Sequence, residues 1–242
     1  MTTHRRILDE PAWLLHHRPF RDSSRILDIL SRDHGRLSVV ARGSRSAKSR
    51  LRGILRPFLP LRLSWVIRSD LGTLTGAEID GSLMSLSGDA LLSAYYVNEL
   101  LLNFLHKHDP QPEIFAVYAD TIANLGSAKN LQSELRSFEI ELLRMLGYAL
   151  NLDHDTHTHE ILADEGLYAY RPEHGPVSVA DRQGPMIFAG RQLLAVSKQQ
   201  FDQPEVLRDA GRLLRETIDY HLGGKELKTR KVLMELRRPA NP

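Results

Sequence analysis

The sequence predicts an α+β protein of several domains, in which a β-rich N-terminal part precedes a mainly helical body. Three observations support this fold class. Apolar and polar residues alternate in much of the first 80 residues, which is the period of a strand with one buried face. After Ser87 the apolar residues recur every three or four positions, as in amphipathic helices. Between residues 151 and 190 neither period holds, because Pro, Gly, His and Asp interrupt short apolar runs.

Five short strands are expected in the N-terminal part. They are residues 13–16, 26–30, 36–42, 61–68 and 71–78. The second and third form a hairpin whose turn chemistry is supplied by Asp33–Gly35. Five strands in so short a segment, with turn signals between them, fit a small closed barrel such as an OB-fold. The stretch from Gly43 to Gly53 is too rich in Ser, Arg and Gly for a strand and is expected to be a mobile basic loop.

Six helices are expected in the remaining chain. They are residues 90–106, 112–125, 131–146, 191–201, 204–222 and 225–238. Pro112 suits a first helical turn, and Gly147 ends the third helix. The predicted domains are therefore an OB-fold at 1–80, a helical domain at 81–150, an irregular insert at 151–190, and C-terminal helices at 191–242 that pack on the helical domain.

Composition excludes several classes of protein. The chain has no cysteine, which excludes disulfides, thiol catalysis and cysteine-ligated metal sites. The N-terminal residues lack the apolar core of a signal peptide, and no apolar run is long enough to span a bilayer. We expect a cytoplasmic protein that does not contact the membrane.

The charge is distributed very unevenly, although the formal net charge is only +2. Residues 1–70 carry a net +9, residues 71–224 a net −11 and residues 225–242 a net +4. From Arg36 to Arg68 there are nine basic residues and no acid: Arg36, Arg42, Arg45, Lys48, Arg50, Arg52, Arg56, Arg62 and Arg68. Such a run favours a polyanion partner, because binding removes the repulsion and releases counterions. A solvated basic surface without a ligand is the alternative.

Aromatic residues interleave with these arginines, as in barrels that stack single-stranded bases. The candidates are Trp13, Phe20, Phe58 and Trp65. The apolar strand positions of Phe58 and Trp65 favour core packing, whereas Phe20 lies among polar residues and is expected to be exposed.

Metal and enzyme motifs are weak. The closest approach to a metal site is Asp153, His154, Asp155, His157, His159 and Glu160, but the spacing matches no established pattern, so a polar loop without metal is favoured. The run Gly223–Glu226 lacks the other residues of a phosphate-binding loop. We therefore expect no enzymatic activity and no cofactor, with a metal-dependent nuclease on this His cluster as a minor alternative.

Three segments together resemble the RecO family. They are Ala12–Leu37, Ala41–Phe58 with its Ala-Arg-Gly-Ser-Arg start, and Tyr220–Arg230 with Tyr-His-Leu-Gly-Gly-Lys-Glu-Leu-Lys-Thr-Arg. The resemblance implies a bacterial recombination mediator of the RecF pathway with an N-terminal OB-fold, a helical domain and a zinc-finger-like insert. Many family members carry four cysteines near the position of His154–Gly166, whereas this chain has none, so the insert is expected to fold without zinc.

The resemblance also implies a role in DNA repair, with binding of single- and double-stranded DNA and annealing of complementary strands. The implied partners are RecR and the acidic tail of single-stranded DNA-binding protein. Help in loading RecA and association with the nucleoid are implied as well. The predicted DNA contacts are Arg36, Arg42, Arg45, Lys48, Arg50, Arg52, Arg56 and Arg62. The predicted partner contacts are Arg136, Arg144, Lys225, Lys228, Arg230 and Lys231. An RNA-binding OB-fold protein is the alternative, because nothing in the basic loop reads a 2′-hydroxyl.

Overall fold

The computed structural model describes residues 5–67, 70–82, 86–181 and 183–237. The chain divides into two compact units. Unit 1 comprises Met1–Ser127 and Leu227–Pro242, and unit 2 comprises Ala128–Glu226. The division differs from the domain boundaries expected at residues 80 and 150, because one helix of the expected helical domain groups with the insert and the last helix returns to unit 1.

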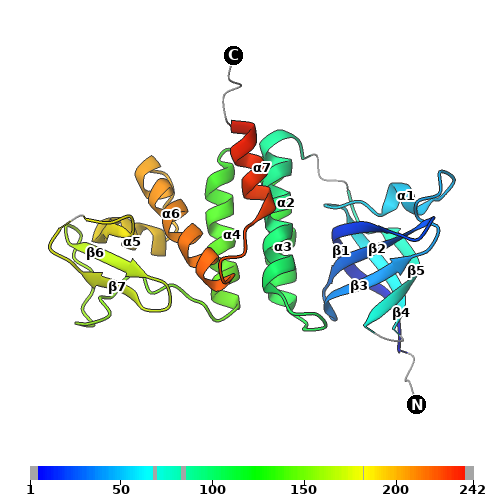
Figure 1. Ribbon diagram of the computed structural model, residues 1–242, viewed down its shortest axis with the longest axis horizontal. Coiled ribbons are helices and arrows are strands. Elements are labelled where there is room, and N and C mark those ends of the chain that lie inside the picture. Colours follow the sequence, from blue (N-terminus) through cyan, green and yellow to red (C-terminus); the bar gives the residue numbers. More distant parts are fainter. Residues whose placement is uncertain (1–4, 68–69, 83–85, 182, 238–242) are drawn as a thin grey trace. The chain divides into compact units, whose positions relative to one another are not determined.

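Five strands of unit 1 close into a barrel in the order β1-β2-β3-β5-β4 (Figure 1). The strands are β1 (Arg5–Phe20), β2 (Ser24–Ser31), β3 (Gly35–Ala41), β4 (Pro60–Ile67) and β5 (Leu71–Ile79). All neighbours are antiparallel except β3 and β5. β1 is much longer than expected, since register shifts after Ile7 and after Leu14 let one strand bend and pair with both β2 and β4.

The barrel interior is filled by alternate residues of the strands, including Leu27, Ile29, Leu37 and Trp65, which are buried. Gly35 forms the β2–β3 turn at a φ of +65°, where only glycine is unstrained. A Cβ on Gly35 would also lie 2.1 Å from the carbonyl oxygen of Asp109, so glycine permits close contact between the barrel and the loop that joins α2 to α3. The expected basic loop contains a single turn of helix, α1 (Leu51–Ile54).

The helices of unit 1 are α2 (Gly88–Phe104), α3 (Pro112–Ser127) and α7 (Lys228–Arg237). Both α3 and α7 pack against α2. The buried side chain of Asn98 on α2 donates to the carbonyl of Leu15 in β1 and accepts from the hydroxyl of Tyr118 in α3. This satisfied polar group fixes the position of α2 and α3 on the barrel.

Unit 2 combines three helices with a small sheet. The helices are α4 (Leu131–Met145), α5 (Gly190–Ser197) and α6 (Pro204–His221), and α6 packs on the other two. The sheet has the order β7-β6-β8, from β6 (Leu167–Arg171), β7 (Gly175–Ser178) and β8 (Ile187–Ala189). These strands of three to five residues lie in the segment expected to be irregular, because so few residues show no clear alternation.

Among the described residues, no helix combines the length and apolarity needed to cross a bilayer.

Candidate nucleic-acid interface

A basic groove lies where the β1–β2 turn meets the loop after β3. A cavity of 390 Å³ there is lined by His17, Pro19, Arg25, Arg45 and Arg52. It continues into a second hollow of 540 Å³ that shares His17, Arg25 and Arg52 and adds Leu55, Arg56, Pro57, Phe58, Leu86, Leu91 and Tyr95. We call the continuous feature groove A. No carboxylate is among these lining residues, so its electrostatic character is set by arginines.

The loop after β3 is held on the β1–β2 turn by Arg45. Its backbone N–H donates to the carbonyl of Ser23 at 2.9 Å, and its guanidinium donates to the carbonyls of Arg21 and Asp22. The buried hydroxyl of Ser44 also donates to the carbonyl of Ala41. The loop predicted from composition is therefore folded against the barrel at this point.

The pKa of His17, which lines groove A, is lowered by its surroundings. Partial burial first, and then the charges of Arg25 and His16, hold the pKa of His17 below its usual value. Its imidazole is therefore neutral at pH 7, and a phosphate entering the groove would favour its protonation.

One exposed aromatic ring faces groove A from α2. Tyr95 is 41% exposed, and its ring lies edge-on to Phe58 with the ring centroids 5.0 Å apart. The ring of Phe58 is buried, as are Trp13 and Trp65, so the core interpretation of Phe58 and Trp65 is confirmed. Tyr95 was not found from the sequence, since it lies outside the basic run on a helix, and only the fold brings it to the arginines.

A second groove, which we call groove B, lies beside the same turn. Its volume is 530 Å³, and its lining includes Phe20, Arg21, Val40, Arg42 and Leu71. The guanidinium carbon of Arg21 lies 5.2 Å from the centre of the Phe20 ring, within the range of a cation–π contact. Phe20 was expected to be exposed and is half-buried, and it lines groove B together with Arg21 and Arg42.

Two of the predicted DNA contacts, Arg36 and Arg62, have partners within the chain. The half-buried Arg36 donates from Nε to the carbonyl of Leu105, which ties the barrel to the end of α2. Arg62 forms ion pairs with Asp9 and Asp80, at 3.5 and 2.8 Å. Neither lines groove A or groove B, and we remove both from the interface. The sequence shows that Arg36 and Arg62 are basic, but it does not show their partners, because these lie far away along the chain.

The remaining members of the basic run are distributed as follows. Arg42, Arg45, Arg52 and Arg56 line the two grooves. Lys48 and Arg50 are exposed on the loop beside them. Arg68 lies outside the described residues. Arg21 and Arg25 precede the run and were missed; Arg21 lies in the β1–β2 turn and Arg25 lies near the start of β2.

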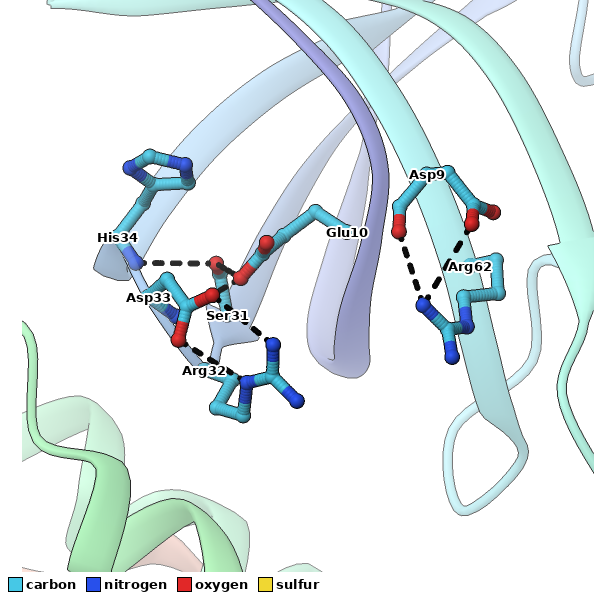
Figure 2. A network of polar contacts seen from close by, with 7 residues as sticks. All are labelled: Asp9, Glu10, Ser31, Arg32, Asp33, His34 and Arg62. Atoms are coloured by element: carbon cyan, nitrogen blue, oxygen red, sulfur yellow. Dashed lines mark hydrogen bonds and ion pairs between the residues drawn. The ribbon is translucent and has the colours of Figure 1, made fainter.

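The opposite end of the β1–β2 ladder carries carboxylates (Figure 2). The buried carboxylate of Glu10 accepts hydrogen bonds from the hydroxyl of Ser31 and the backbone N–H of Asp33, both at 2.8 Å. Asp33 pairs with Arg32, and Asp9 pairs with Arg62. Arg32 and Arg62 at this end form ion pairs with carboxylates. In contrast, no carboxylate is among the residues that line the two grooves.

The predicted partner contacts fall on different surfaces. Arg136 is largely buried and pairs with Glu139 at 2.7 Å, and Arg144 pairs with Glu141 at 2.8 Å, so both form ion pairs within their own helix. Arg230 packs over the ring of Tyr96. The lysines of this set, Lys225, Lys228 and Lys231, are exposed.

The expected polar loop in unit 2 is organised by Asp155. Its buried carboxylate accepts from the backbone N–H groups of His157, Thr158 and Ser178, at 2.8 to 3.1 Å. Burial alone would raise the pKa of Asp155, but these donors together hold it below its usual value. The rings of His154, His157 and His159 belong to exposed residues, and no group of three or more possible metal ligands occurs in the part of the chain that the structure describes.

Comparison with known proteins identifies the family. Residues 6–83 match the model of "Recombination protein O N terminal", and residues 85–231 match "Recombination protein O C terminal". The DNA repair protein RecO of Paraburkholderia xenovorans (strain LB400) is 43% identical over 234 residues, covering 96% of this chain and 78% of the relative. The proteins of the same name from Azoarcus sp. (strain BH72) and Dechloromonas aromatica (strain RCB) are each 40% identical, with 98% of this chain and 99% of each relative covered. The chain therefore belongs to the RecO family of DNA repair proteins.

Proposed function

We propose that this chain is a non-enzymatic mediator of DNA repair and homologous recombination in the RecF pathway, and that its barrel is an OB-fold that binds single- and double-stranded DNA. The observation that carries the proposal is groove A, in which Arg25, Arg52 and Arg56 line the same hollow as the exposed ring of Tyr95. Cations that follow a phosphate backbone, with a ring on which bases stack, are the usual elements of single-strand binding.

Strand annealing follows from electrostatics in this proposal. Two complementary strands repel each other through their phosphates, and arginines that contact both strands reduce the repulsion while bases pair. The chain makes and breaks no covalent bond in this process. Because the charges at the opposite end of the barrel form ion pairs, the positive charge of the grooves is expected to direct DNA toward them.

The wider role in the proposal is to help load RecA onto DNA coated by single-stranded DNA-binding protein, together with RecR and at the nucleoid. The acidic tail of single-stranded DNA-binding protein is expected to bind a basic surface. The exposed Lys225, Lys228 and Lys231 are better candidates for binding this tail than Arg136 and Arg144, because those two arginines already have carboxylate partners.

A strand-annealing assay tests the proposal. The parent protein, an Arg52→Ala/Arg56→Ala variant and an Arg62→Gln control are mixed with complementary strands, with and without single-stranded DNA-binding protein. We expect rapid annealing by the parent and the control, and a loss of at least about tenfold in the groove variant. Equal annealing by all three proteins would contradict the assignment of groove A.

Two further measurements address the alternatives. Matched DNA and RNA oligomers compete for the parent protein, and a clear preference for RNA would favour the RNA-binding alternative. Incubation of labelled DNA with protein and divalent metal should leave the strands intact, and cleavage that depends on His154 and His157 would instead support a nuclease.

A further inference from the structure

The two grooves lie on opposite faces of the β1–β2 hairpin. In the ladder Pro19 is opposite Arg25, and Phe20 is opposite Ser24. Because successive residues of a strand point to opposite faces, these two cross-strand pairs face in opposite directions. The cavity linings agree, since Pro19 and Arg25 line groove A, while Phe20 and Ser24 line groove B.

From this arrangement we propose that groove B is a second single-strand site, so that the hairpin separates two nucleic-acid strands bound to one chain. The inference rests on the proposed function and deepens it by locating the site of the second strand. Groove B offers phosphate contacts at Arg21 and Arg42 and a stacking surface at Phe20. Val40 and Leu71 supply an apolar wall for the bases.

The chemistry of groove B suits nucleic acid rather than a small apolar ligand. Arg21 already covers the Phe20 ring through a cation–π contact, and a base can stack on the same ring or on the guanidinium plane. No carboxylate is among the lining residues of groove B, so no residue of the lining carries a negative charge that repels an entering phosphate. The two grooves thus provide the same kinds of contact, with Phe20 in groove B and Tyr95 in groove A as the aromatic member.

Arg45 connects the two sites. It lines groove A, and its guanidinium donates to the backbone carbonyl of Arg21, whose side chain lines groove B. The separating turn between β1 and β2 is only three residues long and is held from outside by this contact. In this proposal the short hairpin separates the nucleic-acid strand in groove A from the one in groove B. The two nucleic-acid strands can then meet beyond the tip of the hairpin.

The test counts strands on one chain. Oligothymidylates of about six nucleotides, a length within the range that one OB-fold covers, are labelled with a donor or an acceptor dye. They cannot pair with each other. We expect two oligomers per chain at saturation and energy transfer between the dyes, at protein concentrations where sedimentation shows single chains. An Arg21→Ala/Arg42→Ala variant should bind one oligomer and lose the energy transfer.

Matched variants make the outcome decisive. The Arg52→Ala/Arg56→Ala variant should also bind one oligomer, and Arg62→Gln should bind two, with thermal unfolding measured for each protein to confirm the fold. Both groove variants should anneal complementary strands at least about tenfold more slowly than the parent. One oligomer per parent chain, or a groove B variant with unchanged stoichiometry and annealing, would refute the second site while leaving the proposed function intact. A parent protein that binds no DNA would instead refute the proposed function.

Discussion

At the scale of single residues, the protonation of His17 depends on the charges in groove A. His17 lies among Arg25, Arg45 and Arg52 and next to His16, and its imidazole avoids protonation there because it is partly buried among positive charges. A bound phosphate would offset the part of this pKa shift that comes from Arg25 and His16, whereas the larger part, from burial, would stay. The residue is therefore a reporter of whether an anion occupies the groove.

The pH dependence of binding follows from His17. Its pKa is lowered in the free protein and rises when a phosphate binds, so DNA binding takes up a proton. We expect DNA affinity to increase as the pH falls from about 8 to about 6, and to increase less in a His17→Gln variant. Fluorescence titrations at constant ionic strength measure this difference. Identical pH profiles for parent and variant would show that His17 does not sense the bound anion.

Without DNA the same residue has the opposite effect on stability. The lowered pKa means that the unfolded chain binds a proton more readily than the folded chain. Stability linked to His17 is therefore full above its unfolded pKa of about 6.5 and is lost as the pH falls below that value.

Asp155 organises the polar loop of unit 2 through hydrogen bonds to three backbone N–H groups. We predict that Asp155→Ala destabilises unit 2 by about 2 kcal/mol or more, because three backbone donors lose a charged acceptor. Asp153→Ala, which removes an exposed carboxylate that pairs with His154, is the matched control and should have little effect. Urea unfolding with limited proteolysis measures both.

Acid should weaken the same contact. Because the pKa of Asp155 is lowered in the folded chain, its contribution is present above its unfolded pKa of about 3.9 and is lost as the pH falls through the folded value. Equal stability of the Asp155 and Asp153 variants would exclude this role.

At the scale of elements, α7 is anchored by a side chain of α2. The Glu99 carboxylate accepts from the backbone N–H groups of Lys228 and Thr229, both at 2.9 Å, and from the hydroxyl of Thr229 at 2.6 Å. A carboxylate at this position satisfies otherwise unpaired donors and interacts favourably with the helix dipole. Leu227, which precedes the helix, is buried.

We predict that Glu99→Ala weakens this attachment by about 1 to 2 kcal/mol, the usual value of a lost helix cap. Hydrogen exchange at the amides of Lys228 and Thr229 should accelerate, with exchange in the barrel unchanged. Asp120→Ala removes an exposed carboxylate from α3 and is the control. Unchanged protection of α7 in the Glu99 variant would contradict the cap.

Most elements could be predicted because their signals are local. The helices were expected within a few residues of their observed bounds, since each has its own apolar periodicity, and the turn at Gly35 was correct. The length of β1 was missed because its bulges interrupt the alternation between Ile7 and Glu10 and between Leu14 and His16.

The candidate site was only partly predictable, since a charge run does not show the direction of each side chain. Arg36 binds a carbonyl 69 positions later in the sequence, and Arg62 binds Asp80, which follows the end of β5. Conversely, Arg21, Arg25 and Tyr95 reach the grooves through strand pairing and helix packing, which no local pattern reveals.

At the scale of the whole molecule, charge is polarised along the barrel. The basic grooves lie beside the β1–β2 turn, whereas at the other end of the same ladder Arg32 and Arg62 form ion pairs with Asp33 and Asp9. Such polarity orients an approaching polyanion before any contact forms. It also means that the small net charge of the chain understates the local field that DNA meets.

The salt dependence of DNA binding should reflect that local field. If Arg25, Arg45, Arg52 and Arg56 each contact one phosphate, the logarithm of single-strand affinity should fall against the logarithm of salt with a slope of about −3. Replacing Arg45, Lys48, Arg50 and Arg52 by Ala should weaken binding to any sequence and flatten the slope. A replacement that leaves both affinity and slope unchanged would show that this loop is only a solvated surface.

The return of α7 to unit 1 has a consequence for synthesis on the ribosome. The barrel strands are consecutive and can assemble early, but the surface of α2 around Tyr96 receives its partner helix only after all of unit 2 has been made. At about 10 residues per second this delay is roughly ten seconds. During that interval the nascent chain presents uncovered surface on α2, and chaperones have a defined time in which to bind it.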